Sequence, residues 1–148
     1  KTKNEEKDMN KSTASTSVKQ VKRSWHCIDA KGAVLGRVAV EIASKLMGKS
    51  KPYFVRSLDC GDYVVVINAK LVAVTGHKEV EKLYTHYSGH PGGLKTKFLW
   101  QLRAQRPTTI IRRAVMGMLP KNKLRNRVIT RLYIYADDKH PYADKFIK

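Results

Sequence analysis

Basic side chains stand at alternate positions after Pro120, in the stretch "GMLPKNKLRNR". They are Lys121, Lys123, Arg125 and Arg127. An extended chain places alternate side chains on one face, about 6.6–6.8 Å apart. This spacing is close to the separation of successive phosphates along a nucleic-acid strand. We therefore predict that this row of cations is extended and follows a phosphate backbone, with Asn122 and Asn126 on the other face directed to base edges or sugars.

A second candidate binding segment is "YTHYSGHPGGLK", residues 84–95. Gly92 and Gly93 leave the backbone bare beside Lys95, so that its N–H groups can approach a phosphate closely. An ordinary turn is the alternative interpretation of the glycines. The same segment offers histidines that can donate to phosphate and tyrosine rings that can stack on bases. These side chains are Tyr84, His86, Tyr87 and His90.

Metal chemistry is weakly supported. His86 and His90 are four residues apart, a spacing that can hold a metal on a helix. Gly89 and Pro91 argue against a helix there. The cysteines, Cys27 and Cys60, form no CxxC pair, and their spacing supports neither a disulfide framework nor a metal site with histidine. We predict no metal and no cofactor.

The charge distribution favours an anionic partner. Lys and Arg number 30 against 12 Asp and Glu, for a formal net charge of +18. No Asp or Glu occurs from Lys82 to Ala136, which we call the carboxylate-free segment. Solvated surfaces normally mix both signs, so a long segment of one sign predicts a surface for phosphate. The candidate partners are nucleic acid, an anionic membrane surface and an acidic protein.

Membrane and enzyme classes fit less well. No run of 18 apolar residues is present, which predicts no spanning helix, and no basic amphipathic helix with an aromatic face is evident. The segment "KGAVLGR" carries Gly32 and Gly36 but lacks the GxGxxG spacing and the GK[ST] ending of phosphate loops. No GxSxG or paired-carboxylate signature occurs. We predict no enzyme activity and no small-molecule substrate, and keep a nucleotide-using α/β enzyme as the alternative.

The elements that would position these groups form an α/β pattern. Strands are predicted at residues 25–30, 62–68, 71–76 and 131–136, and helices at 35–47, 96–106 and 107–119. Residues 77–95 form an extended excursion or a hairpin. The run "VVVI" in the second strand indicates coverage by helices on both faces. We predict a small, mostly parallel sheet.

Five segments in the same order resemble the large-subunit ribosomal protein L13 family. They are "IDAKGAVLGRVAVEIASKLMGKSKP", "DCGDYVVVINA", "VTGHK", "YTHYSGHPGGLK" and "AVMGMLPKNKLR". The resemblance runs from about Trp25 to about Tyr142. It implies a three-layer α/β/α domain with a four-stranded sheet. It also implies a non-enzymatic component of the large ribosomal subunit that binds large-subunit rRNA early in assembly, beside neighbouring large-subunit proteins.

The resemblance assigns rRNA contacts to residues 45–51, 77–82, 84–95 and 121–131, and the charge pattern adds two arginines of the third predicted helix. The candidate RNA-binding residues are Lys45, Lys49, Lys51, His77, Lys78, Lys82, Tyr84, His86, Tyr87, His90, Gly92, Gly93, Lys95, Arg112, Arg113, Lys121, Asn122, Lys123, Arg125, Arg127 and Arg131. An RNA-binding regulator that acts away from the ribosome is the other alternative.

Two features depart from the usual bacterial form. The stretch "NKLRNRVITRL" lacks the Gly-Arg pair of bacterial members, and the polar N-terminal extension is long. Both resemble mitochondrial members, so we predict a mitochondrial large subunit, with a plastid or bacterial one as the alternative. Residues 1–22 are expected to be disordered or ordered only on rRNA, because they contain too few apolar side chains to form a core. Residues 23–148 are expected to form a single domain.

Overall fold

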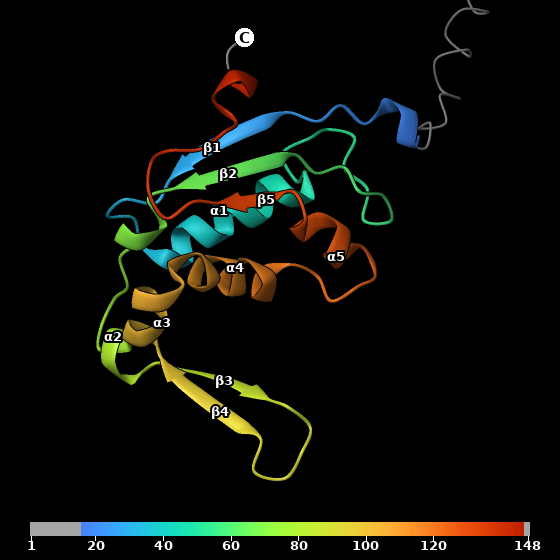
Figure 1. Ribbon diagram of the computed structural model, residues 1–148. Coiled ribbons are helices and arrows are strands. Elements are labelled where there is room, and N and C mark those ends of the chain that lie inside the picture. Colours follow the sequence, from blue (N-terminus) through green and yellow to red (C-terminus); the bar gives the residue numbers. More distant parts are fainter. Residues whose placement is uncertain (1–15, 147–148) are drawn as a thin grey trace, which may run out of the picture.

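The computed structural model describes residues 16–146, and its centre is a parallel sheet of three strands in the order β1-β2-β5 (Figure 1). The strands are β1 (Trp25–Asp29), β2 (Tyr63–Ile67) and β5 (Leu132–Ile134). Two helices, α1 (Leu35–Met47) and α4 (Pro107–Met118), pack against each other and against one face of the sheet. The predicted α/β class with a small parallel sheet is confirmed.

Helix α1 follows directly from its apolar spacing. Leu35, Val38, Ile42 and Leu46 recur every three or four residues, and all four are buried. The helix ends at Gly48, whose φ of 76° is left-handed. A Cβ atom at this position would lie 2.5 Å from the carbonyl oxygen of Cys60. The glycine therefore both ends the helix and lets the following loop return against it.

The opposite face of the sheet is covered by aromatic rings rather than by α-helices. Trp25 stacks on its register partner Tyr63, with ring centroids 4.5 Å apart, and on Tyr142 at 5.0 Å. Tyr133 and the C-terminal turn at Ala143–Lys145 lie over the same face. The expectation of helices on both faces is wrong here, because flat rings on neighbouring strands stack across the sheet and exclude water by themselves.

The predicted strand at residues 71–76 is not formed. Asn68 has a left-handed φ of 57° and turns the chain into a 3₁₀ turn at Ala69–Leu71. Only an isolated parallel bridge between Val34 and Ala73 follows. The sheet in the described part of the chain thus has three strands instead of the four expected from the resemblance.

The remaining pairing is an antiparallel hairpin that extends away from the sheet and its helices (Figure 1). It consists of β3 (Leu83–Tyr87) and β4 (Leu94–Phe98), and it follows the short helix α2 (Lys78–Glu81). Helix α3 is Leu99–Gln105, three residues shorter at its start than predicted, because residues 96–98 pair with β3. None of the helices within residues 16–146 is long and apolar enough to cross a membrane.

Candidate nucleic-acid interface

The hairpin has two chemically different faces, because directly opposed residues of an antiparallel pair lie on the same side. Tyr84 is opposite Lys97, and His86 is opposite Lys95, which makes one face cationic. The other face carries two apolar pairs, with a threonine pair between them; the apolar residues are Leu83, Phe98, Tyr87 and Leu94. Both faces are largely exposed.

Tyr84 shows which way the cationic face is turned. Its ring is half-buried against the core, and burial raises the pKa of its hydroxyl. The guanidinium of Arg113, on α4, lies 5.3 Å from the ring centroid, and the ammonium of Lys82 lies 5.5 Å away. The cationic face of the hairpin is therefore on the side of α4, where Arg112 and Arg113 are exposed. Because cations already lie against the ring of Tyr84, it is less available for stacking on a base than predicted.

The tip of the hairpin is a tight turn. The N–H of Gly93 donates to the carbonyl of His90 at 2.9 Å, so this N–H is already used within the turn. Gly92 is exposed and has a left-handed φ of 72°. His90, Tyr87 and Lys95 are exposed around it. The expected backbone site for phosphate is thus reduced by one donor, while the side chains remain open to solvent.

The predicted extended row after Pro120 is wrong. The chain forms a helix, α5 (Leu124–Ile129), and the side chain of Asn122 accepts the N–H of Arg125 at 3.1 Å at its start. Leu124 lines the space under α5, and Val128 is buried one turn later. This apolar pair at i and i+4 is the sequence signal for a helix. Successive cations of the row therefore do not share one face, and Asn122 is engaged with the backbone.

The cations of this region have different environments. Lys121, Lys123 and Arg127 are exposed, and none has a carboxylate partner within residues 16–146. The guanidinium of Arg125 is half-buried and donates to the carbonyl of Met116 at 2.7 Å. Three of the four predicted contacts thus face solvent, and the fourth is turned toward α4.

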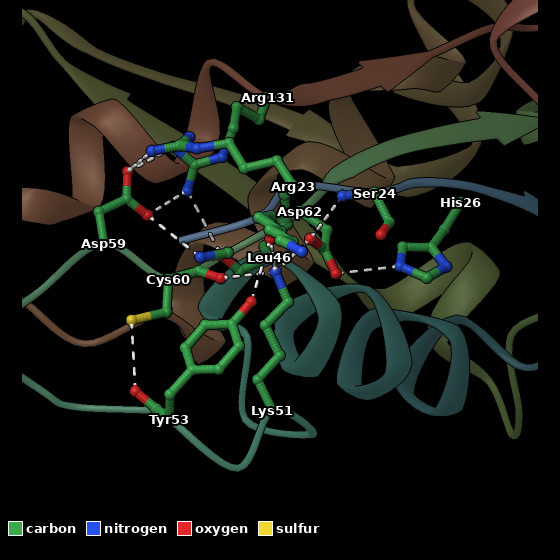
Figure 2. Close-up of polar contacts among 12 residues, drawn as sticks. Arg23, Ser24, His26, Leu46, Lys51, Tyr53, Asp59, Cys60, Asp62 and Arg131 are labelled. Carbon is green, nitrogen blue, oxygen red and sulfur yellow. Dashed lines mark hydrogen bonds and ion pairs between the residues drawn. The ribbon is translucent and has the colours of Figure 1, made fainter. Parts of the chain in front are cut away.

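Arg131 is not available for a binding surface. It is 5% exposed, and its two terminal nitrogens donate to the two carboxylate oxygens of Asp59 (Figure 2). A guanidinium and a carboxylate match in this two-bond geometry. Arg23 approaches the same carboxylate at 3.5 Å. The structure argues against the predicted RNA contact at Arg131, because its charge is neutralised by an acid 72 residues away in sequence.

Lys51 has a similar structural role. Its ammonium contacts a carboxylate oxygen of Asp62 and donates to the carbonyls of Lys22, at 2.6 Å, and Cys60, at 2.9 Å. Asp62 also accepts the N–H of Ser24 at 2.9 Å and lies 3.0 Å from the His26 ring. The cluster joins β1, β2 and the loop after α1, and it argues against the predicted RNA contact at Lys51 for the same reason as at Arg131.

The carboxylates of this cluster have shifted pKa values. Burial disfavours the charged form of Asp62, but hydrogen bonds from Lys51, from the Ser24 N–H and from His26 outweigh it and hold its pKa below the usual value. For Asp59, burial is likewise outweighed by Arg131, and the pKa is lowered. Both groups are therefore ionised at neutral pH and bind the surrounding cations to the core.

A third paired cation, Arg103, was not singled out from the sequence. Its guanidinium donates to both carboxylate oxygens of Glu79, at 2.8 and 2.9 Å, and to the carbonyls of Lys70 and Val72. It joins α3 to the start of α2. Arg103 lies in the carboxylate-free segment, but the fold supplies its carboxylate from outside that segment.

The other candidate RNA-binding residues near α1 and α2 differ in their exposure to solvent. Lys49 is exposed, whereas Lys45 is half-buried and its carbonyl accepts the N–H groups of Gly48 and Asp62. His77 and Lys78 are exposed at the start of α2, and Lys78 approaches the hydroxyl of Thr75 at 3.5 Å. The same short helix carries two acids, Glu79 and Glu81, so this is the least purely positive of the predicted RNA-binding regions.

The geometry gives little support to metal binding or to a nucleotide site. Within residues 16–146 no group of three His, Cys, Asp or Glu residues is arranged to hold a metal ion. Cys27 is exposed and Cys60 is buried. In "KGAVLGR" the N–H of Gly32 donates to Leu71 and that of Leu35 to Ala73. Two backbone donors of this segment, at Gly32 and Leu35, are thus used in packing, which favours the structural interpretation of Gly32.

Comparison with known proteins gives a family match over most of the chain. The profile described as Ribosomal protein L13 matches residues 23–141. A Solibacter usitatus protein named large ribosomal subunit protein uL13 is 52% identical over 123 residues, which cover 83% of this chain and 86% of that protein. A protein of the same name from Dehalococcoides mccartyi is 48% identical over 133 residues, covering 90% and 93%. These relatives are bacterial, and the prediction of a mitochondrial-type member gains no support from them.

Proposed function

The chain belongs to the ribosomal protein L13 family, and we propose that it binds large-subunit rRNA through its exposed, unpaired cations. Its role is structural, as a constituent of the large ribosomal subunit. The compartment in this proposal is a ribosome of bacterial type, in a bacterium or an organelle. The further partners are neighbouring large-subunit proteins.

The observation that carries the proposal is the set of exposed cations without carboxylate partners in residues 16–146. Those that carry the proposal lie at the base and on the strands of the hairpin, on the outer side of α4, on the turn after it and on α5; they are Lys82, Lys95, Arg112, Arg113, Lys121, Lys123 and Arg127. Such charges repel one another when the protein is free. Phosphates that replace their counterions would remove this repulsion and release ions to the solvent.

The fold supports this role by holding the cations on packed elements. Tyr84 fixes the base of the hairpin to α4. Leu119 is buried immediately before Pro120 and Val128 is buried in α5, so the turn that carries Lys121 and Lys123 is held at both ends. Cations on two such elements can contact separate rRNA segments, which is how a small protein stabilises an RNA fold.

The test is the salt dependence of binding to purified large-subunit rRNA. The variant Lys121→Ala/Lys123→Ala/Arg127→Ala should bind more weakly, and the slope of log K against log salt should become shallower by roughly two to three, at about 0.7–0.9 per lost phosphate contact. The control Lys70→Ala/Lys139→Ala/Lys145→Ala removes the same charge beside carboxylates in sequence or space. An equal change of slope in both variants would contradict the proposal.

An RNA-binding regulator would be found in a different complex from a ribosomal constituent. A regulator that acts away from the ribosome would sediment with free RNA complexes, whereas a ribosomal constituent sediments with large subunits. Sedimentation of the tagged full chain in a cell extract separates the two. For the nucleotide-using enzyme, nucleotide alone would have to protect the chain against thermal unfolding.

A further inference from the structure

A cleft separates the cations around α5 from the core. It has a volume of about 380 Å³ and lies between the end of α1, the loop that follows it, the end of α4 and the start of α5. Its walls are mostly apolar, with Met47, Phe54 and Leu58 on one side and Met118 and Leu124 on the other. Clefts of this size and lining are typical of sites for small, largely apolar groups.

The rim of the cleft is basic. Lys49 and Arg56 are exposed at its edge, and neither has a carboxylate partner in the part of the chain described. The only acid in the lining, Asp59, is already paired with Arg131 and Arg23. An occupant thus meets a positive rim above apolar walls.

One donor in the wall is unsatisfied. The Nε–H of Arg125, which lines the cleft, is buried and has no hydrogen-bond partner among the described residues. Its terminal nitrogen is held by the carbonyl of Met116 at 2.7 Å, so the guanidinium is fixed in place. A buried donor without a partner is destabilising. The Nε atom itself has almost no exposed surface, so an occupant of the cleft would reach this donor only if the guanidinium moved.

We propose that this cleft receives one unpaired base of the large-subunit rRNA. The proposal rests on the proposed rRNA binding and adds a specific subsite to it. A nucleobase has flat apolar faces, which suit the apolar walls of the cleft. The phosphates on either side of the base lie at the rim, where Lys49 and Arg56 meet them.

Other occupants fit less well. A base in a regular RNA stem is stacked and paired, so it cannot enter a cleft of this kind. An apolar side chain of a neighbouring protein would fill the walls but would bring no negative charge to a rim that carries two free cations. The charge of the rim therefore favours a nucleotide.

Photo-crosslinking in intact large subunits tests the assignment. The chain has four methionines: Met9, Met47, Met116 and Met118. A Met9→Leu/Met116→Leu chain that contains photoreactive diazirine-methionine carries the label only in the cleft. A Met9→Leu/Met47→Leu/Met118→Leu chain carries it only at Met116, on the same helix but outside the cleft lining. Both chains keep side chains of similar volume at every position.

The expected result is a crosslink from the cleft label to one rRNA nucleotide that is unpaired in the rRNA secondary structure, with no crosslink to that nucleotide from Met116. A crosslink to a ribosomal protein, a crosslink to a paired stem, or no crosslink would overturn the proposal. Failure of the chain to enter large subunits would contradict the proposed function itself, so the two failures are distinguishable.

A filling substitution gives an independent readout. Met118→Trp places a large ring in the cleft, at a residue that is 40% exposed. Met116→Trp adds the same side chain outside the cleft lining, at a residue of similar exposure, 37%. In large subunits with Met118→Trp, the pairing edge of the crosslinked base should become at least threefold more reactive to chemical probes, with no change for Met116→Trp. Equal reactivity in both variants would overturn the proposal.

Discussion

Two groups of cations in this molecule look alike in the sequence and differ in the fold. Lys51 and Arg131 lie in a cluster with Asp59 and Asp62 at the end of the sheet, where they are largely buried and hydrogen-bonded (Figure 2). The hairpin carries Lys95 in full contact with solvent. The family resemblance predicted all of these cations as RNA contacts. The comparison shows that a cation becomes available for binding only where the fold brings no carboxylate to it.

The two groups also differ in what they contribute to stability. A buried pair offsets a large desolvation cost, so removing one partner leaves the other charge uncompensated. An exposed lysine without a partner contributes almost nothing to folding. Substitutions should therefore separate the groups, with loss of stability in one and loss of RNA affinity in the other.

The largest effect is expected at the buried pair. Arg131→Met leaves Asp59 without its two-bond partner and should reduce the free energy of unfolding by about 3 kcal/mol. Urea denaturation of the free protein measures this. The double variant Asp59→Leu/Arg131→Met removes both charges and should be less destabilised than the single variant. A single-variant loss below about 1 kcal/mol would show that the pair is not structural.

Acid should remove the stabilisation by Asp62. Because its pKa is lowered in the folded state, this group contributes stability above its unfolded pKa of about 4, and that stability is lost as the pH falls through the lower folded pKa. Asp62→Asn should cost about 1–2 kcal/mol at pH 7, and the difference from the natural protein should shrink toward pH 3. Unfolding curves between pH 7 and pH 3 measure both. A difference that stays constant with pH would contradict this account.

The smallest effect on stability is expected on the hairpin. Lys95→Ala should change the free energy of unfolding by less than about 0.5 kcal/mol. It should nevertheless weaken binding to large-subunit rRNA and reduce the salt slope by roughly one. Lys70→Ala, which removes an exposed lysine 3.0 Å from Asp137, is the matched control and should leave the slope unchanged. If the control and the hairpin variant behave alike, the exposed and paired cations are not functionally different.

Local patterns were sufficient for most of the fold. The apolar spacing of α1, its end at Gly48 and the two faces of β5, with Leu132 and Ile134 on the helix side, all follow from neighbouring residues. The hairpin follows from the glycine-bearing turn between its strands. In contrast, the cation alternation after Pro120 indicated a strand, while the apolar pair of Leu124 and Val128 gave the correct helical spacing.

The candidate site was less accessible to sequence reasoning, for a physical reason. The carboxylate-free segment is free of acids along the chain but not in space, since Asp59 reaches Arg131 and Glu79 reaches Arg103 from earlier elements. Charge pairing at a separation of 72 residues leaves no local signal. The cleft beside α5 likewise forms only when two distant segments, residues 47–59 and 118–128, pack together, so its apolar walls could not be predicted.

The most direct test is ultraviolet crosslinking of this chain to rRNA in purified large subunits, with mass spectrometry to identify the crosslinked peptides. The account predicts crosslinks at the hairpin around Lys95 and at the turn around Lys121 and Lys123, and none at Arg131 or Lys51. Crosslinks at the two buried cations, or a hairpin and turn that contact no RNA in the assembled subunit, would contradict it.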